Sequence, residues 1–101
     1  MPKHSIRILS VAEKDISDLI DYIAVDSTSA ALNLAEKLEM HILRLEDFPY
    51  SGIVPRDKNL ARKGYRVLKV ESHLVFYCVM DNNIVEVRRV LSGKMDYTFL
   101  L

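Results

Sequence analysis

The segment His73–Met80 constrains this chain most, because every residue from Leu74 to Met80 is apolar. A short run of this kind is typical of a central strand that is buried on both faces. Two further β-rich runs, Tyr65–Val70 and Ile84–Leu91, flank it. The gaps between the three runs hold turn-forming residues and suit tight hairpins. We therefore expect a three-stranded antiparallel meander.

The first half of the chain has helical periodicity instead. Ser10–Glu13 is typical of a capping box, in which the serine and the glutamate satisfy the first amides of a helix. Residues 26–29 interrupt the pattern and offer a second N-cap, and Pro49 and Gly52 are expected to end the second helix. The apolar positions at helical spacing are Ala12, Ile16, Leu19, Ile20 and Ile23, then Ala31, Leu34, Ala35, Leu38, Ile42 and Leu45.

These elements predict an α+β fold in one domain, residues 1–101. Ser5–Leu9 is predicted to be an N-terminal strand, followed by an antiparallel helical hairpin and the three-stranded meander. The helices would cover one face of a four-stranded, mostly antiparallel sheet. Residues 53–63 are polar and predicted to be irregular. The tail that begins at Lys94 ends with Phe99, Leu100 and Leu101, which are available to dock.

Charge is balanced overall but not along the chain. The chain has 14 basic and 14 acidic side chains, so a simple polycation that grips nucleic acid by bulk charge is excluded. Residues 1–50 carry five basic and nine acidic side chains, and the second half carries nine basic and five acidic ones. The stretch from Arg56 to Lys69 is the most basic, with only Asp57 opposing it. This stretch is either a solvated loop or a basic binding surface.

Several kinds of chemistry lack support in the sequence. The single cysteine, Cys78, excludes an internal disulfide and is expected to be a buried structural thiol. His4, His41 and His73 are scattered, so neither a metal nor another cofactor is expected, and His41 is predicted to be a surface or boundary residue. The chain shows no signal peptide and no apolar stretch long enough to span a membrane, which predicts a soluble cytoplasmic protein.

Cationic and phenolic side chains are expected near the strand ends. Arg66 opens one strand, Arg88 and Arg89 lie near the end of the last, and Lys94 and Tyr97 follow it. Strict alternation would place Arg88 and Arg89 on opposite faces of the sheet. Arg66, one of these arginines, Lys94 and Tyr97 could converge on one concave edge and bind a phosphate-rich ligand. Alternatively, these cations pair with Glu86, Asp96 or the helical carboxylates.

Short motifs spread over nearly the whole chain occur in a defined order. They are AEKDISDLIDYIA at 12–24, Ala30-Ala31, Leu45 with Phe48-Pro49 and Gly52, GYRVL at 64–68, LVFY at 74–77 and RVLSGKMDY at 89–97. This order and spacing resemble the RelE/ParE superfamily of bacterial and archaeal toxins from type II toxin–antitoxin modules, often described as plasmid stabilisation proteins. The resemblance implies a growth-arresting toxin that a cognate antitoxin neutralises.

The resemblance implies two mechanisms. ParE-like members inhibit DNA gyrase, whereas RelE-like members cleave mRNA on the ribosome without a metal. In the RelE-like case Arg66 and Lys94 would stabilise the cleaved phosphate, Tyr97 would position or deprotonate the 2′-hydroxyl, and Arg89 would support them. Ser92 stands where the superfamily's terminal motif has a histidine, and serine is no general base near neutral pH.

The motif DYIA, the long helical hairpin and the zero net charge favour gyrase as the target. A third reading is a degenerate toxin that survives as an antitoxin-binding module. In each case the antitoxin is expected to cover apolar grooves beside the helical hairpin. Its acidic side chains would neutralise the stretch Arg56–Lys69.

Overall fold

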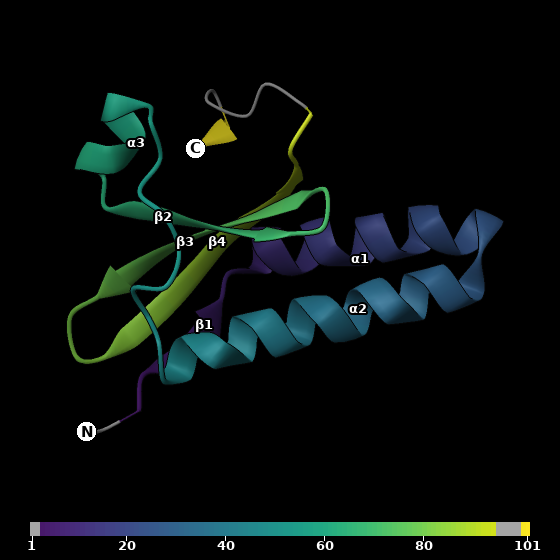
Figure 1. The fold of residues 1–101 in the computed structure, drawn as a ribbon, viewed down its shortest axis with the longest axis horizontal. Helices are drawn as coiled ribbons and strands as arrows, with labels where there is room; N and C mark the ends of the chain where they lie inside the picture. Colours follow the sequence, from purple (N-terminus) through teal and green to yellow (C-terminus); the bar gives the residue numbers. More distant parts are fainter. Residues whose placement is uncertain (1–2, 95–99) are drawn as a thin grey trace.

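The computed structural model describes residues 3–94 and 100–101 and has the expected α+β architecture (Figure 1). A strand and two long helices come first, and three strands follow. In chain order the elements are β1 (Ser5–Ile8), α1 (Ser10–Asp26), α2 (Thr28–Leu43), the 3₁₀ turn η1 (Arg44–Glu46), α3 (Lys58–Arg62), β2 (Tyr65–Val70), β3 (His73–Met80) and β4 (Ile84–Ser92).

The four strands form one sheet in the order β1-β4-β3-β2. The antiparallel meander is confirmed, with β2 and β3 at their expected bounds and β4 one residue longer than expected. The N-terminal strand β1 lies parallel to β4, with Ser5 opposite Ile84. Asn82 and Asn83 turn the second hairpin with φ of 63° and 58°, which asparagine tolerates better than most residues. The sheet is therefore mixed, and β1 and β4, which are far apart in the sequence, lie side by side.

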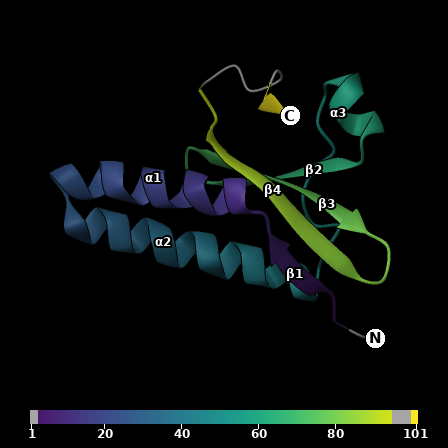
Figure 2. The ribbon, with the colours of Figure 1, turned by 180° about the vertical axis from the view of Figure 1, so that it is seen from behind.

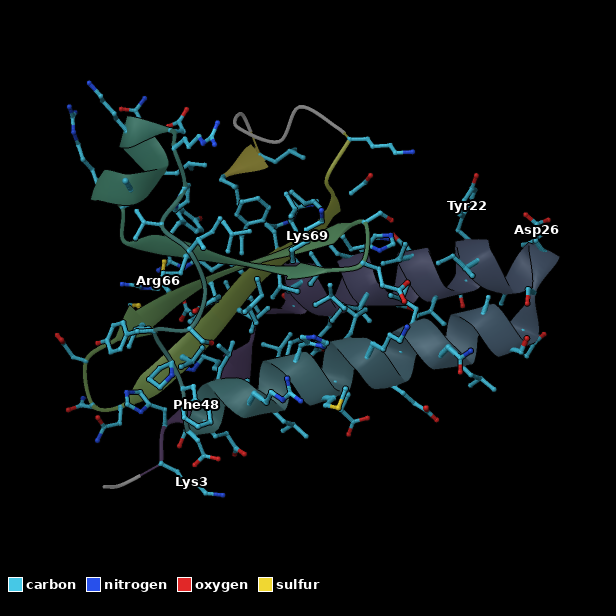
Figure 3. The ribbon with its side chains drawn as sticks, viewed as in Figure 1. Lys3, Tyr22, Asp26, Phe48, Arg66 and Lys69 are labelled. Atoms are coloured by element: carbon cyan, nitrogen blue, oxygen red, sulfur yellow. The ribbon has the colours of Figure 1, made fainter. Side chains whose placement is uncertain are left out.

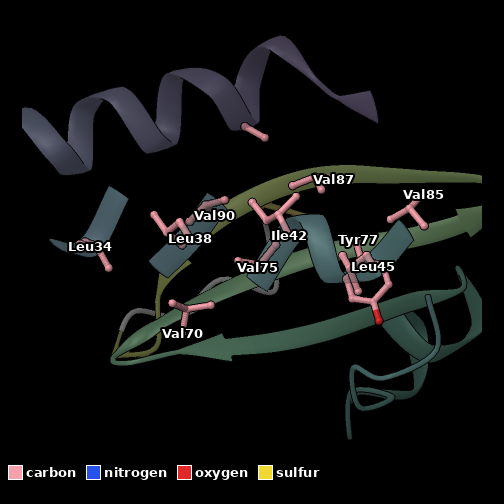
Figure 4. Packing of buried hydrophobic residues seen from close by; sticks show 11 residues of the cluster. Leu34, Leu38, Ile42, Leu45, Val70, Val75, Tyr77, Val85, Val87 and Val90 are labelled. Carbon is pink, nitrogen blue, oxygen red and sulfur yellow. The ribbon is translucent and has the colours of Figure 1, made fainter. Parts of the chain in front are cut away.

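The α1–α2 hairpin packs on one face of this sheet, and its tip extends past the strands (Figures 1 and 2). The larger buried cluster lies between the helices and the sheet (Figure 4). Apolar residues spaced along α2 face valines of β3 and β4, as the helical periodicity predicted. The cluster contains Ala12, Leu34, Leu38, Ile42, Leu45, Val70, Val75, Tyr77, Val85, Val87 and Val90.

A smaller apolar cluster lies on the opposite face of the sheet. Alternate residues of β3 point into it, so β3 is buried on both sides, as its apolar sequence predicted. The helix α3 contributes Leu60, and the chain's last two residues, Leu100 and Leu101, also pack there. Docking of these two leucines confirms that part of the expectation, whereas Phe99 lies outside the described residues. Two separate covers therefore enclose the central strand.

Residues 53–63 are not irregular throughout, which corrects the sequence-based expectation. Ile53 exchanges two backbone hydrogen bonds with Val67 of β2, and Lys58–Arg62 form α3. The side chain of Asp57 begins this helix, because its carboxylate accepts the backbone N–H groups of Asn59 and Leu60. A five-residue helix carries too little periodicity to be recognised in a polar sequence.

The helix boundaries show one confirmed cap and two errors. Ser27 caps α2 by accepting the N–H of Ala30, as expected. The Ser10–Glu13 capping box does not form: Leu9 occupies the N-cap position without a side-chain bond, and Glu13 donates its N–H to the Leu9 carbonyl. α2 ends at Leu43, before Pro49 and Gly52, because the chain tightens into η1 first.

The single cysteine, Cys78, is buried in β3, as expected. Burial raises the pKa of its thiol, with smaller effects from Arg88 (lowering) and Glu86 (raising). We expect a thiol reagent to modify native Cys78 at least about 100-fold more slowly than the chain unfolded in urea, because the reactive thiolate is both rare and covered. Stopped-flow labelling reports this residue alone. Equal rates in both states would contradict the burial.

In the part of the chain that the structure describes, none of the helices is both long and apolar enough to cross a membrane.

Candidate functional site

Arg66, the first predicted site residue, lies at the start of β2, and its guanidinium donates hydrogen bonds to backbone carbonyls. Its Nη1 donates to the carbonyl oxygens of Gly52 at 2.9 Å and Tyr50 at 3.2 Å. Its guanidinium carbon also lies 5.0 Å from the centre of the Tyr50 ring, at cation–π distance. Arg66 therefore holds the segment that connects η1 to α3, which runs along the sheet in Figure 1.

Tyr77 of β3 holds the same segment from inside the core. Its hydroxyl donates to the Pro49 carbonyl at 2.8 Å and accepts the Gly52 N–H at 2.9 Å. Burial raises the pKa of Tyr77, although the Gly52 hydrogen bond and Arg66 act the other way, so the phenol keeps the proton that it donates. Residues 49–53 are therefore held by hydrogen bonds from the side chains of Arg66 and Tyr77 and from the backbone of Val67.

A shallow hollow lies beside Arg66, between the connecting segment, α3 and the start of β2. Its volume is about 290 Å³, and Tyr50, Val54, Gly64 and Tyr65 are among the residues that line it with Arg66. Gly64 adopts a φ of 85°, and apart from its two chain neighbours no residue has an atom within 4 Å of the position that a Cβ would occupy there. The hollow combines one cation with aromatic and aliphatic walls, which suits an acidic group attached to an apolar one.

Arg89, the second predicted site residue, forms an ion pair with Asp15 of α1. Its Nε and Nη2 donate to the two carboxylate oxygens at 2.7 and 2.9 Å, and the Val90 N–H donates to the same carboxylate at 3.0 Å. Both side chains are mostly buried, and the bonds to Asp15 raise the pKa of Arg89. Because β1 ends at Ile8, the Asp15 carboxylate occupies the edge of β4 that β1 leaves open.

A β-bulge separates the two neighbouring arginines. Tyr77 pairs with Val87 and Phe76 pairs with Arg89, so Arg88 has no opposite residue on β3. Strict alternation therefore fails beyond Arg88: Val90 packs in the helix-side cluster, and Leu91 lies in the opposite one.

Arg88 itself lies on the sheet face opposite the long helices. Its guanidinium carbon is 5.3 Å from the ring centre of Tyr65, and its Nε donates to Glu86 at 2.9 Å. Arg7 of β1 approaches the same carboxylate at 3.5 Å. Arg88 and Arg89 therefore both pair with carboxylates, as the alternative reading of the cations expected.

Lys94, the third predicted site residue, is exposed beyond the end of β4, where its N–H bonds to the Ser92 hydroxyl. Ser92 lies opposite His73, which pairs with Val70, four residues along β2 from Arg66. Four residues of strand span about 13 Å, and Lys94 follows beyond that point. The expectation that Arg66 and Lys94 meet at one edge is therefore wrong. Tyr97 lies outside the described residues.

The motif order now has independent support. A family model described as the ParE toxin of the type II toxin–antitoxin system parDE matches residues 6–97. This chain belongs to the ParE toxin family. A comparison with curated proteins gives no match.

Two solved structures show that the ParE-family fold of this chain has known counterparts. One is a structure of the chromosomal ParDE toxin–antitoxin system from P. aeruginosa. A chain in it is similar to this protein with a TM-score of 0.72 and 14% sequence identity, and the match covers 91% of this chain and 98% of that one. The other is the RelBE2 toxin–antitoxin complex from Mycobacterium tuberculosis. A chain in it is similar with a TM-score of 0.58 and 21% sequence identity, and the match covers 91% of this chain and 99% of that one. At these identities the likeness establishes the fold.

Three residues that contact the predicted site residues or hold the segment beside them were missed by sequence reasoning: Asp15, Tyr50 and Tyr77. Tyr77 left a signal, because a buried tyrosine within an apolar strand needs a partner for its hydroxyl. Asp15 and Tyr50 left none, because neither spacing nor residue type indicates which distant arginine each contacts. Within residues 3–94 and 100–101, no group of three or more histidine, cysteine and carboxylate side chains could hold a metal ion.

Proposed function

We propose that this ParE-family chain arrests growth by ParE-like inhibition of DNA gyrase in the cytoplasm, and that a cognate antitoxin neutralises it. The observation that carries this proposal is the ParE family match, which spans residues 6–97. The two similar solved structures belong to toxin–antitoxin complexes, which supports a protein antitoxin as partner.

The geometry of the candidate residues also supports binding rather than RNA cleavage. A metal-independent nuclease needs its acid, base and cationic groups within hydrogen-bond reach of one phosphodiester. Here Arg66 binds two backbone carbonyls, Arg89 binds Asp15, and Lys94 lies at the other end of the sheet from Arg66. Under this proposal Arg66 and Arg89 maintain the shape of the toxin, and exposed Lys94 is free to contact gyrase.

Inducible expression of the chain alone tests the proposal. We expect growth to stop, gyrase-linked DNA breaks to accumulate, and coexpression of the neighbouring small gene to restore growth. We expect Lys94→Glu to weaken the arrest without changing the thermal midpoint, since the side chain is exposed. Ribosome-dependent mRNA cleavage without DNA breaks would instead assign the RelE-like activity. Unchanged growth at confirmed expression would contradict a toxin of either kind.

A further inference from the structure

The segment 48–54 exposes large apolar side chains although its backbone is firmly held. The exposed fractions are 64% for Phe48, 61% for Tyr50, 71% for Ile53 and 52% for Val54. Connecting segments are ordinarily polar, and neighbouring exposed apolar residues mark interaction surfaces. Figure 3 shows Phe48 beside the C-terminal end of α2, and Arg66 at the same end of the molecule.

The hydrogen bonds that hold the backbone of segment 48–54 determine how this segment can bind a partner. Arg66 and Tyr77 bind its carbonyls and one N–H, and Ile53 pairs with Val67. A partner would therefore meet side chains whose backbone is already ordered, so little conformational entropy is lost on binding. Exposed aromatic residues on a rigid backbone are the usual anchors of protein interfaces.

The charges beside segment 48–54 indicate what kind of partner fits. Among the described residues, the ion pairs include none of the cations of the stretch 56–69, and the Asp57 carboxylate is engaged at the start of α3. Glu46 and Asp47 line a cavity together with Phe48 and Tyr50, so acidic side chains lie at the Phe48 end. The basic stretch begins two residues after Val54, so positive charge lies at the other end of the segment. The cations in question are Arg56, Lys58, Arg62, Lys63, Arg66 and Lys69.

We propose that segment 48–54 is a docking surface for an acidic protein segment whose apolar side chains cover Tyr50, Ile53 and Val54. The carboxylates of that segment would face the stretch 56–69, with one of them at the hollow beside Arg66. The Tyr50 ring offers a base a stacking surface, but aliphatic Ile53 and Val54 offer it neither a stacking surface nor a hydrogen bond, so a protein partner fits the whole surface better. This inference rests on the proposed function, because the antitoxin is the partner.

A matched pair of double variants tests the docking surface. The test variant is Tyr50→Ser/Ile53→Ser. The control is Tyr22→Ser/Val25→Ser, at positions 77% and 83% exposed in the last turns of α1. Figure 3 shows Tyr22 far from Arg66. The probe is the protein encoded beside this chain's gene, and calorimetry measures its affinity. We expect the test variant to bind at least about 10-fold more weakly and the control to bind as the wild type does.

A charge variant gives a second arm. Arg56→Glu/Lys58→Glu is expected to weaken binding at low salt, with the difference from wild type shrinking as salt rises. In cells, the Tyr50→Ser/Ile53→Ser variant should still arrest growth but escape neutralisation. That outcome separates the surface from the toxic activity.

Several results would overturn the docking surface. They are unchanged affinity of the test variant, an equal or larger loss in the hairpin control, failure of the neighbouring protein to bind the wild type, and competition by a short RNA that depends on the same two side chains. A chain that binds its neighbour through segment 48–54 but leaves growth unaffected would contradict the proposed function and leave the docking surface in place. Circular dichroism and thermal midpoints establish that each variant is folded.

Discussion

Replacing Asp15 with alanine should lower the free energy of unfolding by about 3 kcal/mol, a large effect for one side chain. The substitution leaves the Arg89 guanidinium and the Val90 N–H without the carboxylate that now binds both. The exposed fractions of the Arg89 and Asp15 side chains are only 20% and 14%, so water replaces the lost bonds poorly. Urea unfolding followed by circular dichroism measures the change.

Two further variants separate the ion pair from simple loss of packing. Asp18→Ala removes an exposed carboxylate that bonds to Lys14 on the same helix, and it should leave the unfolding midpoint unchanged. Asp15→Ala/Arg89→Met should recover part of the loss, because no unpaired charge then remains buried. A double variant as unstable as the sum of the single ones would contradict this account.

Replacing Gly52 with alanine should destabilise the fold by about 2–3 kcal/mol. A Cβ at this position would lie 2.5 Å from the Tyr77 hydroxyl oxygen and 2.9 Å from the Val67 carbonyl oxygen. Both neighbours are buried or part of the sheet, so the segment must move away and lose its clamps. The need for glycine arises from this close approach. Thermal and urea unfolding measure the change.

A double-mutant cycle identifies the cause. Tyr77→Phe alone leaves the buried Pro49 carbonyl and Gly52 N–H unpaired, at a cost of about 1–3 kcal/mol. Combined with Gly52→Ala, it removes the atom in closest contact, so the pair should cost less than the sum of the two. Gly64→Asn is the control, because asparagine tolerates a positive φ and that position is open. Additive costs would indicate that the contacts with the Tyr77 ring carbon Cε1 and the Val67 carbonyl oxygen, which Tyr77→Phe leaves in place, dominate.

The strands were predictable because runs of consecutive apolar residues indicate which of them are buried. Residues 74–80 form an apolar run that indicates a strand covered on both faces, and the turn residues beside it indicated the bounds of β2 and β3. The capping box at Ser10 failed because a local motif competes with tertiary context: the helix begins directly after β1, where Leu9 bonds to Val87. Local sequence does not contain that contact.

The candidate site was less predictable, because it depends on register and on long-range pairs. The bulge at Arg88 changed which residues of β4 face the helices, and no sequence signal marks it. Arg66 and Arg89 were predicted to be site residues, but the partners that they contact lie 14 and 74 positions away in the chain. Residue type identifies a cation, whereas only the fold determines whether that cation binds a ligand or the chain itself.

The parallel pairing of β1 with β4 has a consequence for how the chain folds during its synthesis. Ser5 cannot pair with Ile84 until residue 84 has been synthesised, because β4 is the strand that lies beside β1 in the sheet. Contacts between such distant positions form late and slowly. The apolar face of the helical hairpin packs on β3 and β4 in the folded chain, so it stays uncovered until most of the chain has been synthesised. A partner that is already folded by then would meet each new molecule as soon as its sheet is complete.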